Sequence, residues 1–176
     1  LEILQMDKDV RREFRKKYGY EVYEKDGDFS SLCSEYEYDN KMERYFELIE
    51  ILKIFSSNGF LAYIVGGYPR DIYLDRKSID IDICTNATPK DLATIFNGSI
   101  LPKQEYGGVT VIVNKIVFEI TTFRKEIKYE NNRFPVKIKY IDSLLDDLKR
   151  RDFTMNTMCI DSNGNLIDLL NGKVDI

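Results

Sequence analysis

The stretch Ile64-Val-Gly-Gly-Tyr-Pro-Arg-Asp71 is followed, after a short amphipathic segment, by Asp80-Ile-Asp-Ile-Cys-Thr85. The first part places a glycine pair after an apolar strand, where backbone N–H groups can face phosphate oxygens. In the second part, alternate side chains of an extended strand share one face about 7 Å apart. Asp80 and Asp82 are therefore predicted to point the same way, with the intervening isoleucines directed into the core. Together the two parts predict a site for a nucleoside triphosphate and magnesium.

The two aspartates are the candidate metal ligands. Taken alone, such a pair is more often a feature of a solvent-facing edge strand. Here the flanking isoleucines require a core face, and aspartate is disfavoured in strands, so Asp80 and Asp82 need another explanation. Like charges repel unless a cation lies between them, and carboxylates at this spacing can hold two ions ~3.5–4 Å apart. We therefore expect two Mg²⁺ ions here.

Length and composition exclude several classes of protein. The chain has 176 residues, 43% of them hydrophobic, which suits one domain or one domain with an appendage. A net charge of −4 argues against broad nonspecific nucleic-acid binding. Locally, residues 124–151 carry nine Lys or Arg against five Asp or Glu. The chain has no histidine, which excludes Ser-His-Asp triads, Cys-His dyads and His-ligated zinc. Catalysis here must use carboxylates, Lys or Arg, and metal.

The cysteines and the apolar runs indicate a compartment. Cys33, Cys84 and Cys159 form no C-x-x-C pair, and the last two lie in apolar runs typical of strands. We expect buried thiols in a reducing cytoplasm. No apolar run approaches the ~18–20 residues that span a bilayer, so we expect no membrane partner.

A P-loop kinase is poorly supported, because no G-x-x-x-x-G-K-[ST] occurs.

Hydrophobic periodicity and turn residues predict an α+β fold with a mixed, mostly antiparallel sheet and helices on one side. We divide the chain into an N-terminal extension of unknown role (1–40), a catalytic head (41–170) and the start of a further segment (171–176). A basic helix is expected over 3–17 and an irregular segment over 18–40. The next expected elements are a helix N-capped by Asn40 and ending at Gly59, a strand at 61–65, a helix to Leu74 and a strand at 78–84. They are followed by a helix at 89–96 capped by Thr88, and by a hairpin at 108–113 and 116–123 with an Asn114-Lys115 turn. The last expected elements are a mobile loop at 124–135, a strand at 136–141, a helix capped by Ser143 through Arg151, and a hairpin at 157–160 and 166–169.

The glycine pair is the candidate phosphate cradle. Gly66 and Gly67 lie between a strand and a helix that opens with Pro69. Arg70 has two readings that the sequence leaves open. It can pair locally with Asp71, or it can reach a triphosphate oxygen from the first turn of the helix.

Glu119 and a group of residues around Arg151 each have a functional and a plain explanation. Glu119 lies in the middle of an apolar strand, either as a third member of the metal site or as an exposed residue of an edge strand. Arg150, Arg151 and Asp152 end a helix, where basic residues complement the helix dipole. With Asn156 they can instead contact the ribose and phosphates of a nucleotide.

Five segments together resemble the bacterial-type tRNA nucleotidyltransferases, or CCA-adding enzymes, and their poly(A) polymerase relatives in the polymerase-β-like superfamily. They fall in family order and family-like spacing over residues 45–176. The segments are Val65-Gly-Gly-Tyr-Pro-Arg-Asp71, Asp80-Ile-Asp-Ile-Cys-Thr-Asn-Ala-Thr-Pro89, Tyr106-Gly-Gly-Val-Thr-Val111, Phe118-Glu-Ile-Thr-Thr-Phe-Arg124 and Arg150-Arg-Asp-Phe-Thr-Met-Asn156.

The resemblance implies a head domain on a mixed five-stranded sheet that transfers C and A from CTP and ATP to the 3′ end of tRNA, by two-metal phosphoryl transfer. It implies that Asp80 and Asp82 bind magnesium, with Glu119 as a further catalytic residue. It places Gly67 and Arg70 at the triphosphate, and Arg151 with Asp152 at the incoming nucleotide. The loop from residue 125 to 149 has about the family's full length; in these enzymes it helps the switch from C to A addition, so a CC-only form is less expected.

Three departures from the family pattern leave alternatives open. Residues 106–109 read Tyr-Gly-Gly-Val where relatives usually carry His-Gly-Thr-Val. Residues 1–40 have no recognised counterpart, and the base-selecting Glu-Asp-x-x-Arg segment of the family lies past Ile176. The alternatives are a poly(A) polymerase with the same chemistry, and a head that binds nucleotide with little turnover on its own.

Overall fold

The computed structural model describes residues 35–76, 78, 80–97, 100–102, 108–113, 116–130 and 134–176. The predictions for residues 1–34, for Ile79, for Tyr106 and for the Asn114-Lys115 turn lie outside these residues. Within the described helices, none is long and apolar enough to cross a membrane.

A seven-stranded sheet in the order β3-β4-β5-β2-β1-β8-β9 forms the centre of the described chain. The β2–β5 pair is parallel and the other neighbours are antiparallel, which confirms the predicted mixed, mostly antiparallel sheet. The expected count of five strands was wrong, because seven strands pair in this sheet, with β3 at one edge and β9 at the other. The strands are β1 Ala62–Val65, β2 Asp82–Thr85, β3 Ile100–Pro102, β4 Gly108–Val113, β5 Ile116–Thr122, β8 Cys159–Ile160 and β9 Leu166–Ile167.

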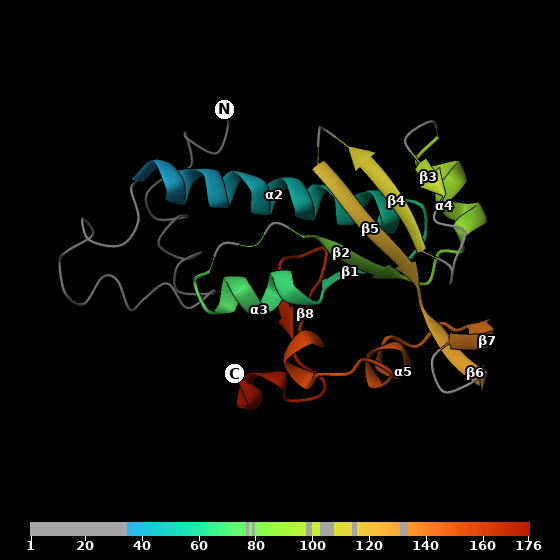
Figure 1. Cartoon of the computed structure of the whole chain (residues 1–176). Helices are drawn as coiled ribbons and strands as arrows, with labels where there is room; N and C mark the ends of the chain where they lie inside the picture. The colour runs from blue at the N-terminus through green and yellow to red at the C-terminus, as the bar shows by residue number, and fades with distance from the viewer. Residues whose placement is uncertain are drawn as a thin grey trace.

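The long helix α2 (Glu35–Ser57) covers one face of this sheet (Figure 1). Its buried stripe follows helical spacing and packs on apolar side chains of β1, β2 and β5. These residues are Tyr45, Leu48, Leu52 and Phe55 on α2, and Ile64, Ile83, Phe118 and Ile120 on the strands. The prediction of an N-cap at Asn40 was wrong, because the helix already begins at Glu35. An asparagine inside a helix lowers helix stability by well under 1 kcal/mol relative to alanine. A capping pattern alone therefore does not fix the start of a helix when the residues before it also favour the helical conformation.

Two short helices begin where their caps predict. Helix α4 (Pro89–Ile95) follows Thr88, whose hydroxyl accepts the Asp91 amide while the Asp91 carboxylate accepts the Thr88 amide. Helix α5 (Leu144–Lys149) follows Ser143, whose hydroxyl accepts the Asp146 amide. The expectation of helices on one side holds for α2 and α4.

A smaller apolar cluster lies on the opposite face of the sheet and includes α5. Its buried members are Val65, Cys84, Phe123, Leu148 and Cys159. The two cysteines are buried and free, as predicted. Neighbouring residues of β1, β2 and β8 thus alternate between the two clusters, because successive strand side chains point to opposite faces.

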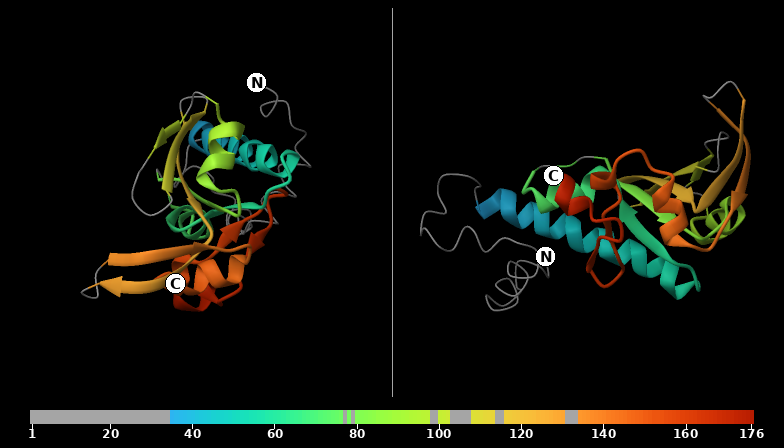
Figure 2. Two further views of the ribbon diagram at one scale, coloured as in Figure 1. Left: turned by 90° about the vertical axis from the view of Figure 1, so that its right-hand side faces the viewer. Right: turned by 90° about the horizontal axis from the view of Figure 1, so that it is seen from below.

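Residues 124–130 and 134–140 form a separate two-stranded sheet. β6 (Arg124–Glu130) pairs with β7 (Phe134–Tyr140), with irregular register near Lys128. The prediction of a mobile loop over 124–135 was wrong for its described residues, 124–130 and 134–135. The charged residues of β6 are typical of a loop when the local sequence is considered alone. They form a strand because β7 supplies the partners for their backbone hydrogen bonds. The hairpin extends from the body like an arm (Figure 2).

The C-terminal residues pack closely on the segment that carries Asn156. The 3-10 turns η3 (Thr154–Asn156) and η4 (Gly172–Asp175) lie against each other, and the Thr154 hydroxyl bonds the Asp175 carboxylate. A Cβ added at Gly172 would lie 2.3 Å from the Thr154 carbonyl oxygen. Only glycine allows this approach of the two backbones.

Substitution of Gly172 by alanine should therefore destabilise the fold. The added methyl group meets backbone rather than a flexible side chain, and we expect a loss of about 1–3 kcal/mol in the free energy of unfolding, measured by urea titration. Lys90→Ala, at an exposed position of α4, is the control and should change stability by less than about 0.5 kcal/mol. Equal stability of Gly172→Ala and the unsubstituted protein would contradict the close packing.

Candidate active site

The turn between β1 and α3 (Gly67–Tyr73) meets the first residue of β2. Gly66 has φ of 85° and is buried, and a Cβ at this position would lie 3.0 Å from Oδ2 of Asp82. Val65, the last residue of β1, is the strand partner of Asp82. The Asp82 carboxylate therefore lies directly against the glycine turn that the sequence predicts as a phosphate cradle.

A row of polar side chains crosses three strands beside this turn. Asp82 pairs in register with Glu119 on β5, and Glu119 pairs with Thr110 on β4. The Thr110 hydroxyl donates to Oε1 of Glu119 at 3.0 Å. Paired residues of adjacent strands share a face, and adjacent strands lie about 4.8 Å apart. The edge-strand explanation of Glu119 is excluded, because β5 lies between β4 and β2.

Asp80 lies just outside the strand that was predicted to contain it. β2 begins at Asp82 instead of Ser78, and Asp80 is exposed. β1 ends at Val65, the partner of Asp82, so the β1–β2 pairing of the described residues stops there. The predicted alternation still holds, since Ile81 and Ile83 are buried in the core shared with α2.

The carboxylates fit magnesium better than a metal that needs many protein ligands. Among the described residues, no group of three or more His, Cys, Asp or Glu side chains is arranged to hold a metal ion. Mg²⁺ usually takes only one or two carboxylates and completes its shell with phosphate oxygens and water. Neighbouring Asp82 and Glu119, with Asp80 exposed beside them, meet this requirement.

Arg70 is held in place on the other side of the turn. Its Nε donates to Oδ1 of Asp71 at 2.9 Å, and one terminal nitrogen donates to Oδ1 of Asn156 at 2.8 Å. The local pair with Asp71 that the sequence left open does form. A Cβ at Gly67 would lie 3.4 Å from the other terminal nitrogen of Arg70. The fold thus brings Gly67, Arg70 and Asn156 together from segments far apart in the chain.

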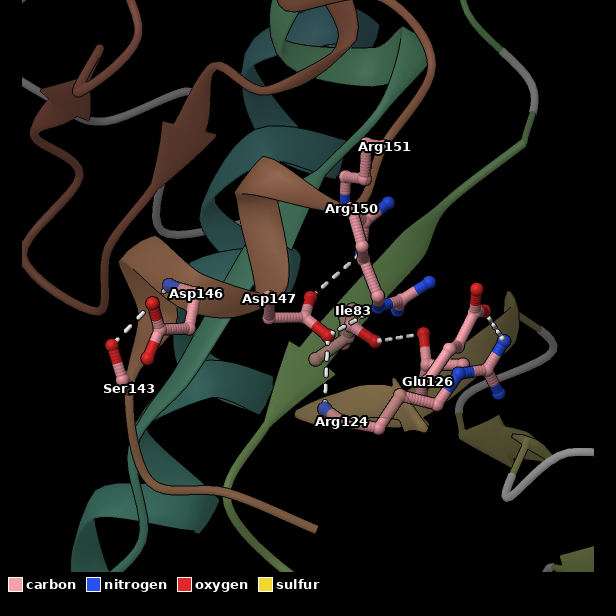
Figure 3. Close-up of polar contacts among 9 residues, drawn as sticks. Ile83, Arg124, Glu126, Ser143, Asp146, Asp147, Arg150 and Arg151 are labelled. Atoms are coloured by element: carbon pink, nitrogen blue, oxygen red, sulfur yellow. Dashed lines mark hydrogen bonds and ion pairs between the residues drawn. The ribbon is translucent and has the colours of Figure 1, made fainter. Parts of the chain in front are cut away.

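A third group of charges surrounds Asp147, a residue that the sequence analysis missed. Asp147 is fully buried on α5 and contacts both Arg150 and Arg151 (Figure 3). The available signal was the spacing of three and four residues, but on a helix this spacing also occurs in ordinary surface pairs. Asp152, next in the chain, is exposed.

Arg151 lies on the same side of the sheet as Asp82. Burial raises the pKa of the Cys84 thiol well above its ordinary value, and the nearby positive charge of Arg151 acts in the opposite direction. Cys84 is two residues beyond Asp82 on β2, so the two side chains share a face. Leu148, three residues before Arg151, packs in one cluster with Val65 and Cys84, so the end of α5 lies on the face that carries the acidic row.

Comparison with known proteins identifies the family of the chain. The family model described as the poly A polymerase head domain matches residues 62–176. The chain belongs to the poly A polymerase head domain family. Over 134 residues it is 42% identical to the CCA-adding enzyme of Bacillus pumilus (strain SAFR-032), covering 76% of this chain and 34% of the relative. The CCA-adding enzyme of Bacillus mycoides (strain KBAB4) is also 42% identical, with 75% and 33% covered.

Solved structures show the same head fold. The crystal structure of the Bacillus stearothermophilus CCA-adding enzyme in complex with CTP gives a TM-score of 0.65 at 35% identity, covering 74% of this chain and 31% of that one. A tRNA nucleotidyltransferase complexed with a primer tRNA and an incoming ATP analog gives 0.54 at 34% identity, covering 71% and 36%. The resemblance and the fold class inferred from the sequence are confirmed. This head domain spans about a third of the length of the curated relatives it matches.

Two glycines with the same backbone conformation test the contact between the turn and Asp82. Gly59 has φ of 81° and no neighbouring atom within 4 Å of where a Cβ would stand, whereas Gly66 has φ of 85° and faces Asp82. Gly59→Ala should cost only the left-handed strain, about 1 kcal/mol of unfolding free energy. Gly66→Ala should cost more, because the methyl group must also displace the carboxylate. Equal losses in chemical denaturation would show that Asp82 does not press on the turn.

Proposed function

We propose that this protein is the catalytic head of a tRNA nucleotidyltransferase that adds C and A from CTP and ATP to the 3′ end of tRNA. The observation that supports this most directly is the pairing of Asp82 with Glu119 against the Gly66 turn. A CCA-adding enzyme in complex with CTP and a tRNA nucleotidyltransferase complexed with a primer tRNA and an incoming ATP analog share the head fold.

Asp80 and Asp82 are the proposed ligands of two Mg²⁺ ions, with Glu119 as the third catalytic carboxylate. Bound magnesium would lower the pKa of the RNA 3′-hydroxyl and offset the charge of the departing pyrophosphate. The protein's own part is to fix acidic side chains where they need no rearrangement. The hydrogen bond from Thr110 fixes Glu119, and Gly66 leaves room for Asp82.

The opposite side of the turn would hold the triphosphate. Backbone N–H groups of Gly66 and Gly67 and the Arg70 guanidinium would contact phosphate oxygens, with Asn156 and Asp71 keeping Arg70 oriented. Arg151 and Asp152 would contact the incoming nucleotide. In the transfer, the 3′-hydroxyl oxygen bonds the α-phosphorus while the bond to pyrophosphate breaks. Holding these groups in line accounts for several of the ~7–11 kcal/mol that orientation can contribute.

Two alternatives have specific support. A poly(A) polymerase is suggested by the description of the family model. A head that binds nucleotide with little turnover is suggested for the 176-residue chain alone, because it spans only a third of its curated relatives. Calorimetric titration of this chain with CTP, ATP and GTP distinguishes the latter, since we expect weak binding with poor base preference. A sharp preference for CTP would contradict it.

Substitution of the central carboxylates tests the proposed chemistry. In the full-length protein, Asp82→Ala should abolish Mg²⁺-dependent nucleotide incorporation into tRNA, because the ligand nearest the turn is lost. Glu119→Gln should reduce it strongly, while circular dichroism shows an intact fold. Asp142→Asn, at an exposed position after β7, is the matched control and should keep full activity. Full activity of Asp82→Ala would disprove the metal assignment.

Nucleotide choice separates the proposed function from polyadenylation. The full-length protein supplied with CTP alone should extend a tRNA that lacks its CCA end by cytidines, and ATP should then complete the end. A poly(A) polymerase should use CTP poorly and extend with ATP alone. Gel analysis of the extended RNA distinguishes these results.

A further inference from the structure

Asp147 has three hydrogen-bond partners in two separate parts of the fold. Its Oδ1 accepts the backbone amide of Arg124 at 3.1 Å and Nε of Arg150 at 2.9 Å. Its Oδ2 accepts a terminal nitrogen of Arg151 at 3.3 Å. The side chain has 0% exposure, and a buried carboxylate is tolerated only when it is paired and hydrogen-bonded. The carboxylate thus joins the start of β6 to the arginines that follow α5 (Figure 3).

One carboxylate holds two neighbouring arginines. Helix α5 ends at Lys149, Arg150 is its C-cap and Arg151 is the next residue. The two oxygens of Asp147 each accept from a different guanidinium group, so both groups are held on the side of the carboxylate.

The cluster has more positive than negative charge. Three arginines, Arg124, Arg150 and Arg151, lie around Asp147, and Glu126 approaches Arg124 with 3.8 Å between the charged atoms. Burial, and next the charge of Arg150, lower the pKa of Arg124. Three guanidinium groups against two carboxylates leave one positive charge, which suits an anionic ligand.

Arg151 keeps hydrogen-bonding capacity for such a ligand. Its Nε is buried and has no hydrogen-bond partner among the described residues. The side chain as a whole is 19% exposed. Arg151 lies on the face of the sheet that carries Asp82. A polyphosphate bound at the glycine turn would therefore lie on the same side of the sheet as this arginine.

We infer that Asp147 is a positioning residue for nucleotide binding, which holds Arg151, with Arg150 beside it, toward the triphosphate of the incoming nucleotide. This inference rests on the proposed function. Asp147 itself touches no substrate. It acts through the arginines, and its hydrogen bond to the Arg124 amide fixes the whole group relative to the sheet.

The substitution Asp147→Asn in the full-length protein tests this role with little change of shape. The two donors at Oδ1 favour an asparagine whose oxygen stays there, so its NH₂ group faces Arg151 and cannot accept a hydrogen bond from it. We expect kcat/KM for CTP to fall by about tenfold or more, mainly through a higher KM, and the calorimetric Kd for CTP to rise by a similar factor. KM for tRNA should remain within about twofold.

A double-mutant cycle with Arg151→Lys separates positioning from plain structural support. If Asp147 acts through Arg151, the Asn substitution should cost at most about twofold in the Arg151→Lys background. Equal losses in both backgrounds would overturn the inference, because a structural defect does not depend on residue 151. Asp146→Asn, which removes the neighbouring ion pair with Lys125 at 3.0 Å, is the control and should keep kcat/KM within about twofold.

Thermal unfolding accompanies each variant. If Asp147→Asn lowers Tm by more than about 10 °C, the cycle is measured with Asp147→Glu, which keeps the charge but displaces it by one methylene; the same dependence on Arg151 is expected. Wild-type kcat/KM in Arg151→Lys, or no nucleotide transfer by the unsubstituted protein, would overturn the proposed role of the site and the inference with it. If Arg151→Lys reduces kcat/KM but Asp147→Asn keeps it unchanged, the inference about Asp147 is overturned while the proposed function stands.

Discussion

The antiparallel pairing of β1 with β2 ends at Val65 and Asp82, and the candidate site is built around this end point. The chain leaves β1 through Gly66, whose positive φ and missing side chain let the Asp82 carboxylate approach the turn to 3.0 Å of where a Cβ would stand. Asp82 also pairs with Glu119 of β5, on the parallel side of β2. One register thus fixes the glycine turn and two carboxylates relative to one another.

The sheet separates stability from chemistry by its two faces. On one face, Ile64, Ile83 and Ile120 pack beneath α2, and this burial supplies most of the apolar contact. On the other face, Asp82 and Glu119 lie beside each other, and a smaller apolar cluster with Leu148 supports α5. Because strand side chains alternate, a residue of the site and a residue of the core are neighbours in sequence but not in environment.

The arginines of the site are held by protein carboxylates and amides before any ligand arrives. Arg70 is bound by Asp71 and Asn156, and Arg151 by Asp147. A buried ion pair is often no more stabilising than apolar side chains of similar volume. Its advantage here is orientation, since a guanidinium that is already fixed loses less conformational entropy when it contacts a phosphate.

The sequence by itself determined the features that depend on a few neighbouring residues. The caps at Thr88 and Ser143, the hairpins and the alternation around Asp82 were predicted from local spacing, and the motif order indicated the family. Only the tertiary structure decided the rest: that Glu119 lies on a central strand, that β6 is a strand, and that Asp147 is buried between arginines. Local patterns fix backbone preference and capping, because these depend on residues within a turn or two. The identity of a strand's neighbour and the burial of a charge depend on segments that meet only after folding, so the same local pattern fits both an exposed surface pair and a buried anchor.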